Sequence, residues 1–206
     1  MPVIMGTHRV FPDLGGRSWT EFVNDDQYLN LLLDFGYNDL QLTDYKIGST
    51  PLGSFSDLQI EESVGTTGAV SIFALNVDTI SGGTLIYTDP PIIRTSSAGV
   101  TALAVECVGT VFVVDENTGV IINGAVAFAL QYCATGTGAW APFDPASPVG
   151  INVINASRQP VKRTFYRTVP LGQYDVRMTR QSLDSASTKI FSDWSWTQLR
   201  SYQPDS

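Results

Sequence analysis

The sequence predicts an all-β protein, with a small antiparallel β unit followed by a larger two-sheet β-sandwich. Charged residues make up only 16% of the 206-residue chain, hydrophobic residues make up 43%, and 18 Gly and 11 Pro supply many turns. Apolar and polar side chains alternate with period two in several separate runs, as they do in half-buried strands. Clusters of Gly, Pro, Asn and Asp separate these runs.

The first predicted unit spans residues 1–93 and centres on residues 27–62. Its longest apolar run places four large side chains on one strand face, namely Leu29, Leu31, Leu33 and Phe35. Period two, closed by Gly36, favours a largely buried strand. A helix is the alternative, because Leu29, Leu32 and Leu33 also share one helical face.

Two shorter runs, residues 40–47 and 57–62, predict further strands on either side of a turn at residues 48–53. Residues 63–93 have the weakest pattern and are expected to form a Gly/Ser/Thr-rich excursion, with candidate short strands at residues 69–77 and 84–87. Pro90 and Pro91, near the end of this stretch, stiffen the chain and have no N–H to donate to a neighbouring strand. Such a segment suits a connection between domains.

The second predicted domain spans residues 94–206. Five alternating runs predict its antiparallel strands, at residues 100–114, 125–133, 161–169, 173–181 and 191–202. Residues 170–174 resemble the approach to the sixth strand of a fibronectin type III domain, where a Tyr hydroxyl bonds to nearby backbone. Tyr174 is then the corner residue, and Trp140 after a Gly-rich turn fits the same pattern. We expect a fibronectin type III-like sandwich.

The net charge of −8 is unevenly placed along the chain. Residues 1–157 carry 4 basic and 16 acidic residues, whereas residues 158–206 carry 8 basic and 4 acidic residues. The overall acidity argues against nucleic-acid recognition. Two solvated surfaces of opposite charge explain this uneven distribution. The alternative is that oppositely charged ends of neighbouring subunits attract each other in an assembly. No run reaches the ~18 apolar residues of a membrane span, so none is expected.

The sequence predicts no catalytic, cofactor or metal site, and therefore no enzyme. His8 is the single histidine, whereas metal sites and most triads need several such residues. The adjacent carboxylates at residues 25–26 and 61–62 point to opposite faces of extended chain. Residues 115–119 lack the oxygen spacing of a calcium loop and predict a polar turn. A glycosidase pair from distant carboxylates is an alternative for which the sequence singles out no residues.

Side chains on the sandwich strands supply the remaining candidates. Trp194 and Trp196 share one strand face and are expected in the core, with a sugar-binding platform as the alternative. Side chains alternate between the two faces of a strand, and this alternation places Cys107 inward and Cys133 outward. The two thiols then cannot meet, so both are expected to be free. Cations on neighbouring strands predict either a solvated face or a protein interface. They are Arg163, Arg167, Arg177 and Arg180, together with Lys162.

Several motifs occur in a fixed order along the chain. They are Pro2-Val3-Ile4-Met5-Gly6, Asp25-Asp26-Gln27-Tyr28-Leu29, Gly36-Tyr37-Asn38-Asp39, Ile47-Gly48-Ser49-Thr50-Pro51, and the C-terminal residues 172–180 and 196–201. This set resembles the host-specificity protein J family of siphophage and prophage tail tips. The turns depart from the family pattern at Asn38-Asp39 and at Ser49. The most diagnostic residues are those of the Gly36-Tyr37 and Ile47-Gly48 breaks, and Thr50 and Pro51 are further residues of the family motifs.

The resemblance implies a structural role without catalytic residues. Such proteins assemble as a homotrimeric hub at the distal end of the tail, contact other tail-tip and tail-tube proteins, and support host attachment and DNA ejection. The protein would be made in the bacterial host cytoplasm and located in the virion tail tip. The chain would be an internal portion of a longer protein, with residues 27–62 part of a hub barrel. Alone, it can be monomeric, because the rest of each interface is missing.

Two functions from other classes remain open at this point. A fibronectin-like carbohydrate-binding or adhesion module of a larger protein would need an exposed face at Trp194 and Trp196. An enzyme would need a deep pocket with converging carboxylates.

Overall fold

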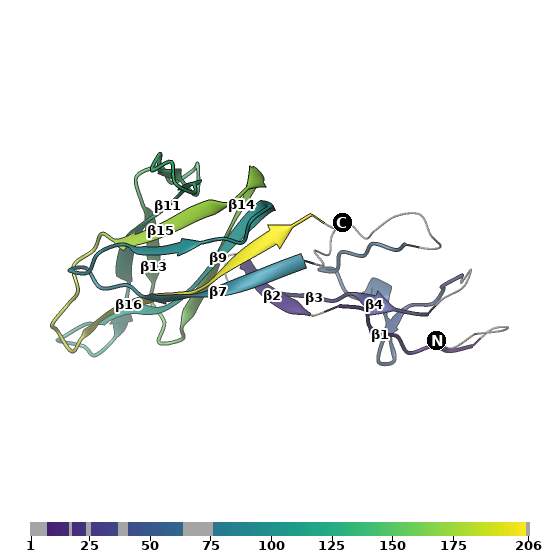
Figure 1. Ribbon diagram of the computed structural model, residues 1–206. Helices are drawn as coiled ribbons and strands as arrows, with labels where there is room; N and C mark the ends of the chain where they lie inside the picture. Colours follow the sequence, from purple (N-terminus) through teal and green to yellow (C-terminus); the bar gives the residue numbers. More distant parts are fainter. Residues whose placement is uncertain (1–7, 17, 24–25, 37–40, 64–75, 205–206) are drawn as a thin grey trace. The chain divides into compact units, whose positions relative to one another are not determined.

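A computed structural model describes residues 8–16, 18–23, 26–36, 41–63 and 76–204. Almost all of their regular structure is β, and the sheets are antiparallel, which confirms the predicted fold class (Figure 1). These residues form two compact units. The first comprises described residues within 1–19 and 30–75, and the second comprises Thr20–Leu29 and Asn76–Pro204.

The first unit contains short strand pairs. β1 (Asp13–Leu14) pairs with β4 (Leu33–Asp34). β5 (Lys46–Ile47) pairs with β6 (Thr50–Pro51), and the short 3-10 turn η1 (Leu52–Ser54) follows. Two-stranded ribbons bury little surface of their own.

Three strand predictions in this region are wrong or too long. In the predicted strand at residues 40–47, only Lys46–Ile47 of the described residues is β. The run at residues 28–35 does not form one buried strand, because β3 (Asp26–Asn30) ends and β4 begins with a different partner. Leu29, Leu31 and Leu33 are 60%, 45% and 44% exposed. Residues 57–62 contain no strand. Alternation produces a strand only where a neighbouring strand supplies the ladder, and sequence alone does not show the neighbour.

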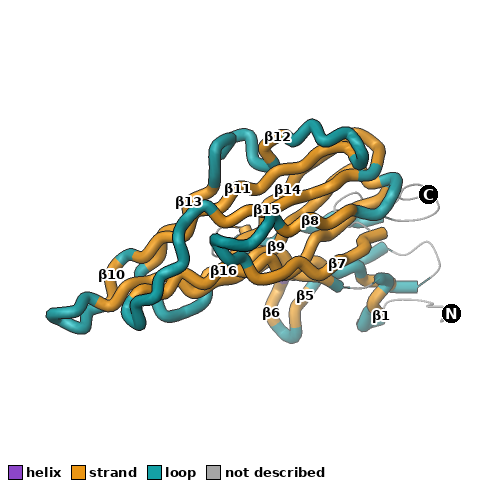
Figure 2. The backbone as a smooth tube through the Cα atoms, turned by 60° about the vertical axis from the view of Figure 1, so that its left-hand side comes forward, coloured by secondary structure: helices purple, strands orange, loops and turns teal. Residues whose placement is uncertain are grey.

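The second unit is a sandwich of two sheets (Figure 2). In the first sheet, β9 is central, with β16 along one side and β14 and β10 along the other, and β7 continues beyond β16. The strands of this sheet are β7 (Asn76–Thr84), β9 (Val100–Val114), β10 (Ile121–Ile122), β14 (Val161–Gly172) and β16 (Ile190–Gln203).

The second sheet is built around β11, which pairs with β15 on one side and with β12 and β13 on the other. β8 pairs with the far side of β15. The strands of this sheet are β8 (Ile92–Thr95), β11 (Gly124–Ala134), β12 (Ala141–Pro142), β13 (Ile151–Asn155) and β15 (Tyr174–Arg180).

The five long strands predicted from alternation are all present, as β9, β11, β14, β15 and β16. β7 and the start of β8 precede residue 94, yet both strands belong to the sandwich, because β7 pairs with β16 and β8 pairs with β15. β7 runs through Ser81-Gly82-Gly83, a sequence that indicates a turn when read locally.

The core between the sheets is dominated by two tryptophans. Trp194 and Trp196 are 0% and 1% exposed, and Trp194 stacks on Phe128 with a centroid distance of 5.5 Å. Glycines make room for both indoles. A Cβ atom on Gly109 would lie 2.2 Å from the Trp194 ring, and one on Gly82 would lie 2.4 Å from the Trp196 ring. Larger residues at either glycine would displace an indole from the core.

Candidate interaction surface

A charge pair lies on the face of the first sheet that points away from the core. Glu106 of β9 lies between Thr164 of β14 and Gln198 of β16 in the strand register. Arg200 forms an ion pair with its carboxylate, and Gln198 donates a hydrogen bond to the second carboxylate oxygen. The side chains of Arg200 and Glu106 are only 4% and 12% exposed. The sandwich itself therefore compensates both buried charges.

A β-bulge in β16 places Arg200 on this face. The register against β9 shifts between Trp196 and Gln198, and the Thr197 hydroxyl donates to the Glu106 carbonyl (2.9 Å). Because the bulge inserts one residue, Trp196 points into the core while Gln198 and Arg200 point outward. Without it, all three side chains would share one face.

The segment Thr20–Leu29, which we call the strap, contacts this face through β2 (Trp19–Val23), which pairs with β3. The Phe22 N–H donates to the Thr164 hydroxyl oxygen (2.9 Å), and Arg200 donates to the Thr20 carbonyl. The Lys162 ammonium nitrogen lies 4.7 Å from the centroid of the Phe22 ring, within cation–π range.

Sequence reasoning did not identify this surface. Glu106 carries the one signal that could have indicated it, since it is a lone carboxylate in the otherwise uncharged run of β9. A charge at a strand centre requires a partner when it is buried. The partner, Arg200, lies far away in sequence, so no local spacing points to it.

Tyr174 begins β15 and ties two turns together. Its hydroxyl donates to the Pro170 carbonyl (2.7 Å), the tyrosine-corner bond of fibronectin-like sandwiches. Its main chain exchanges two hydrogen bonds with Ser96, at 3.0 Å to the hydroxyl and 2.8 Å from the Ser96 N–H. Burial, with a smaller contribution from Tyr132, raises the pKa of the Tyr174 hydroxyl.

Tyr174→Phe is expected to lower the free energy of unfolding by about 0.5–1.5 kcal/mol, because the Pro170 carbonyl loses its donor. Urea unfolding followed by circular dichroism measures the change. Tyr166→Phe is the matched control, because Tyr166 is 58% exposed and its hydroxyl can bond to water. Equal losses in the two variants would contradict a specific role for the corner bond.

The alternative of a sugar platform finds no exposed surface at Trp194 and Trp196, because both indoles lie inside the sandwich. Trp140 is half-buried and lies outside the core cluster, with the Arg177 guanidinium 4.2 Å above its ring.

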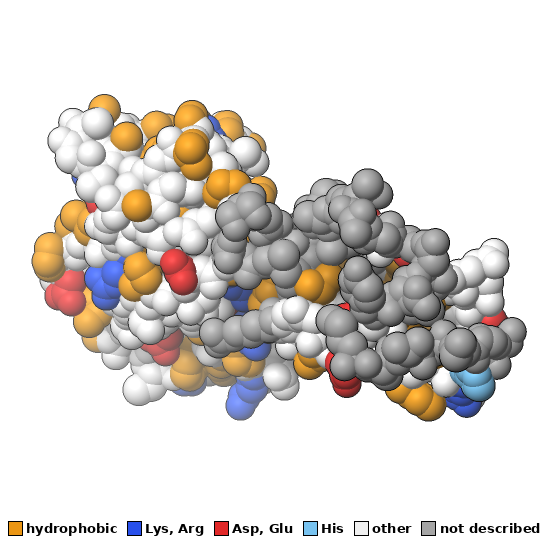
Figure 3. All heavy atoms as spheres, turned by 45° about the vertical axis from the view of Figure 1, so that its right-hand side comes forward, with side chains coloured by type: hydrophobic (Ala, Val, Ile, Leu, Met, Phe, Trp, Pro, Cys, Tyr) orange, Lys and Arg blue, Asp and Glu red, His pale blue; other side chains and the backbone are white. Residues whose placement is uncertain are grey.

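The predicted cationic residues lie on β14 and β15, which belong to different sheets of the sandwich. On β14, Arg163 donates to the Lys162 carbonyl (3.1 Å). Arg167 donates to the Phe143 carbonyl (3.1 Å) and the Tyr132 hydroxyl (2.9 Å). On the face of the sandwich in Figure 3, blue and red side chains are interspersed.

The two cations on β15 also serve different neighbours. Arg177 donates to the Gln131 amide oxygen (2.8 Å). Arg180 is buried, donates to Ser192 (2.9 Å), and forms an ion pair with Asp184 (3.1 Å). Arg180 therefore stabilises the sandwich interior, and an interface made by all four predicted arginines stays a prediction.

The diagnostic residues of the first unit shape its turns. The pairing of Ile47 with Thr50 leaves Gly48 and Ser49 as the hairpin loop, and Gly48 has a φ of +64°, which glycine adopts without strain. Pro51 pairs with Lys46 in the same hairpin.

Gly36 has a φ of +99°, and its N–H donates to the Asp34 carboxylate (2.8 Å). Tyr37, the other residue of that motif, lies outside the described residues.

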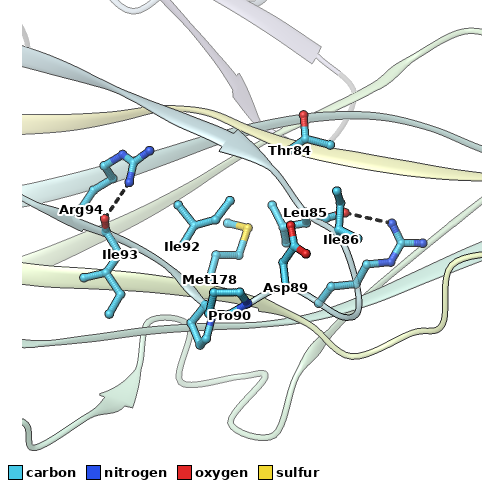
Figure 4. Close-up of a pocket in the computed structure, with 11 residues that line it drawn as sticks. Thr84, Leu85, Ile86, Asp89, Pro90, Ile92, Ile93, Arg94 and Met178 are labelled. Atoms are coloured by element: carbon cyan, nitrogen blue, oxygen red, sulfur yellow. Dashed lines mark hydrogen bonds between the residues drawn. The ribbon is translucent and has the colours of Figure 1, made fainter.

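A hollow of about 290 Å³ opens at the edge of the sandwich between the ends of β7 and β8 (Figure 4). Leu85, Ile92 and Met178 line it. Beside it, Arg94 donates to the Ser81 carbonyl (2.7 Å) and the Gly82 carbonyl (2.5 Å) of β7. An arginine that occupies the free carbonyls of an edge strand blocks the addition of a further strand.

Both cysteines are free, as predicted, and both are buried. Cys107 lies in the core, whereas Cys133, which was expected to point outward, is 3% exposed without belonging to the core cluster. Neighbouring chain therefore covers that face of β11 too. Burial raises the pKa of the Cys107 thiol well above its ordinary value, with the nearby Glu106 carboxylate adding a smaller effect.

We expect both thiols to resist alkylation in the folded protein, because both are buried away from the reagent. At Cys107, burial also disfavours the thiolate, which is the reactive form. Reaction with iodoacetamide at neutral pH, counted by mass, should reach two thiols only in denaturant. Rapid labelling of Cys107 in the native protein would contradict its position in the core.

Among residues 8–16, 18–23, 26–36, 41–63 and 76–204, no cluster of three potential metal ligands occurs. In the same ranges, no helix is long and apolar enough to cross a membrane. His8 is exposed, and residues 115–119 form a turn in which the Asp115 carboxylate accepts bonds from Asn117 and Thr118.

The comparisons with known proteins agree with the sandwich geometry. Residues 76–205 match the family model described as tip attachment protein J, FNIII-A domain. This match covers well over half of the chain and begins at β7. No curated protein matches the chain. The chain therefore belongs to the tip attachment protein J family of phage tail-tip proteins, and residues 76–205 are its FNIII-A domain.

Proposed function

We propose that this chain is a hub portion of the tail-tip attachment protein. In this role, three copies of the full-length protein assemble at the distal end of the tail, where they contact other tail-tip and tail-tube proteins and support host attachment and DNA ejection. The observation that carries the proposal is the family match over residues 76–205.

The architecture also supports a structural role. A hub must transmit force without deforming, and two sheets packed on a continuous apolar core provide stiffness. Inter-subunit contacts between β domains use faces and edges of sheets. The 44–60% exposure of Leu29, Leu31 and Leu33 supplies apolar surface in the region whose sequence motifs resemble those of the protein J family.

The solution mass of the full-length protein tests the assembly. Multi-angle light scattering should give three copies under conditions in which tails assemble. A full-length protein that stays monomeric under all such conditions would refute the hub role. The 206-residue chain alone is not the right sample, because it can be monomeric in either case.

A further inference from the structure

We propose that the outer face of strands β14, β9 and β16 is a binding surface for the main chain of an extended strand, and that the strap occupies it reversibly. The strap is the segment Thr20–Leu29, which lies outside the matched residues 76–205. In this proposal, the strap leaves the face while the sandwich stays folded.

The surface recognises main-chain atoms of β2. The carbonyl of Thr20 and the N–H of Phe22 point to the same edge of an extended strand, because successive peptide groups alternate in direction. The sandwich places a donor, Arg200, at the first and an acceptor, Thr164, at the second. Such a donor–acceptor pair is suited to bind extended backbone, and Lys162 adds a contact to the Phe22 ring.

The described side chains of the strap bury little apolar surface of their own. Its described side chains, at residues 20, 22 and 26–29, are all half-buried or exposed, and none is buried. Tyr28 and Leu29 are already 42% and 60% exposed in the docked state. Segments with few buried apolar contacts open at a lower free energy than the core does.

The buried charges on the face under the strap are paired within the sandwich and do not need the strap as a partner. The partners of the Glu106 carboxylate, Arg200 and Gln198, both belong to β16, so release leaves the buried carboxylate paired. An unpaired buried charge would make release costly, and the arrangement avoids this. Both the docked and the released state are therefore accessible to a folded sandwich.

Amide hydrogen exchange of the whole 206-residue chain, resolved by NMR, tests the proposal. The Phe22 amide should be protected, yet exchange at least about a hundredfold faster than the amides of Leu103 and Val105 in β9, which open only with the sandwich. Thr164→Val removes the acceptor and should accelerate Phe22 exchange by about three- to tenfold, with β9 unchanged.

Thr168→Val is the matched control, because Thr168 lies on the same face of β14 and is exposed. It should leave Phe22 exchange unchanged. An unprotected Phe22 amide in the unmodified chain would overturn the docking. Exchange as slow as that of Leu103 and Val105 would overturn the reversibility, and an equal response to both valine variants would overturn the role of Thr164.

Discussion

Trp194→Ala is expected to lower the free energy of unfolding by about 3–5 kcal/mol, as removal of a fully buried aromatic side chain typically does. The indole is fully buried between the sheets, stacked on Phe128 and lying directly over Gly109. Its removal leaves a cavity that rigid strands on both sides cannot close. Urea unfolding followed by circular dichroism, with the slope compared between variants, measures the loss.

Trp140→Ala is the control for this substitution. It removes the same indole from a half-buried position, where the main described contact is the Arg177 guanidinium at 4.2 Å. The expected cost is about 1 kcal/mol. If the two variants lost equal stability, Trp194 would not be the centre of the core.

Arg200→Met is expected to lower the free energy of unfolding by about 3–5 kcal/mol, because Glu106 then lies buried without a counter-charge. Arg158→Met, at an exposed position on the same protein, should cost less than about 1 kcal/mol. Thermal and urea unfolding of both variants measure the difference.

A double-mutant cycle separates the ion pair from the packing. Replacing Glu106 and Arg200 together by Met should restore most of the stability lost in Arg200→Met, since no charge is then left unpaired. If the double variant were as unstable as the sum of the single variants, the two side chains would not be coupled, and the charge pair would not stabilise this face.

The long sandwich strands could be predicted because each has one face in the core. In β15, Tyr174, Val176 and Met178 are buried and alternate with half-buried residues, which is the pattern that the sequence displays. The same logic failed for β7, whose Gly82 and Gly83 indicate a turn locally. Gly82 is required there by the indole of Trp196, a contact between strands far apart in sequence.

The alternating pattern also gave a wrong strand prediction where the chain does not keep one neighbouring strand along its length. Residues 28–35 place a leucine or Phe at every second position, but the pairing changes from β2 to β1 within the run, and Leu29, Leu31 and Leu33 remain exposed. The buried pair of Glu106 and Arg200 could not be predicted for a related reason. Its geometry depends on the register between β9 and β16 and on the bulge at Thr197, neither of which has a local signature.

Labelling of intact phage particles tests the tail-tip role most directly. Antibodies raised against the FNIII-A sandwich, coupled to gold and viewed by electron microscopy, should decorate the distal end of the tail in particles of the phage that encodes this chain. Label on the capsid, label along the length of the tail tube, or absence of the protein from purified particles would contradict it.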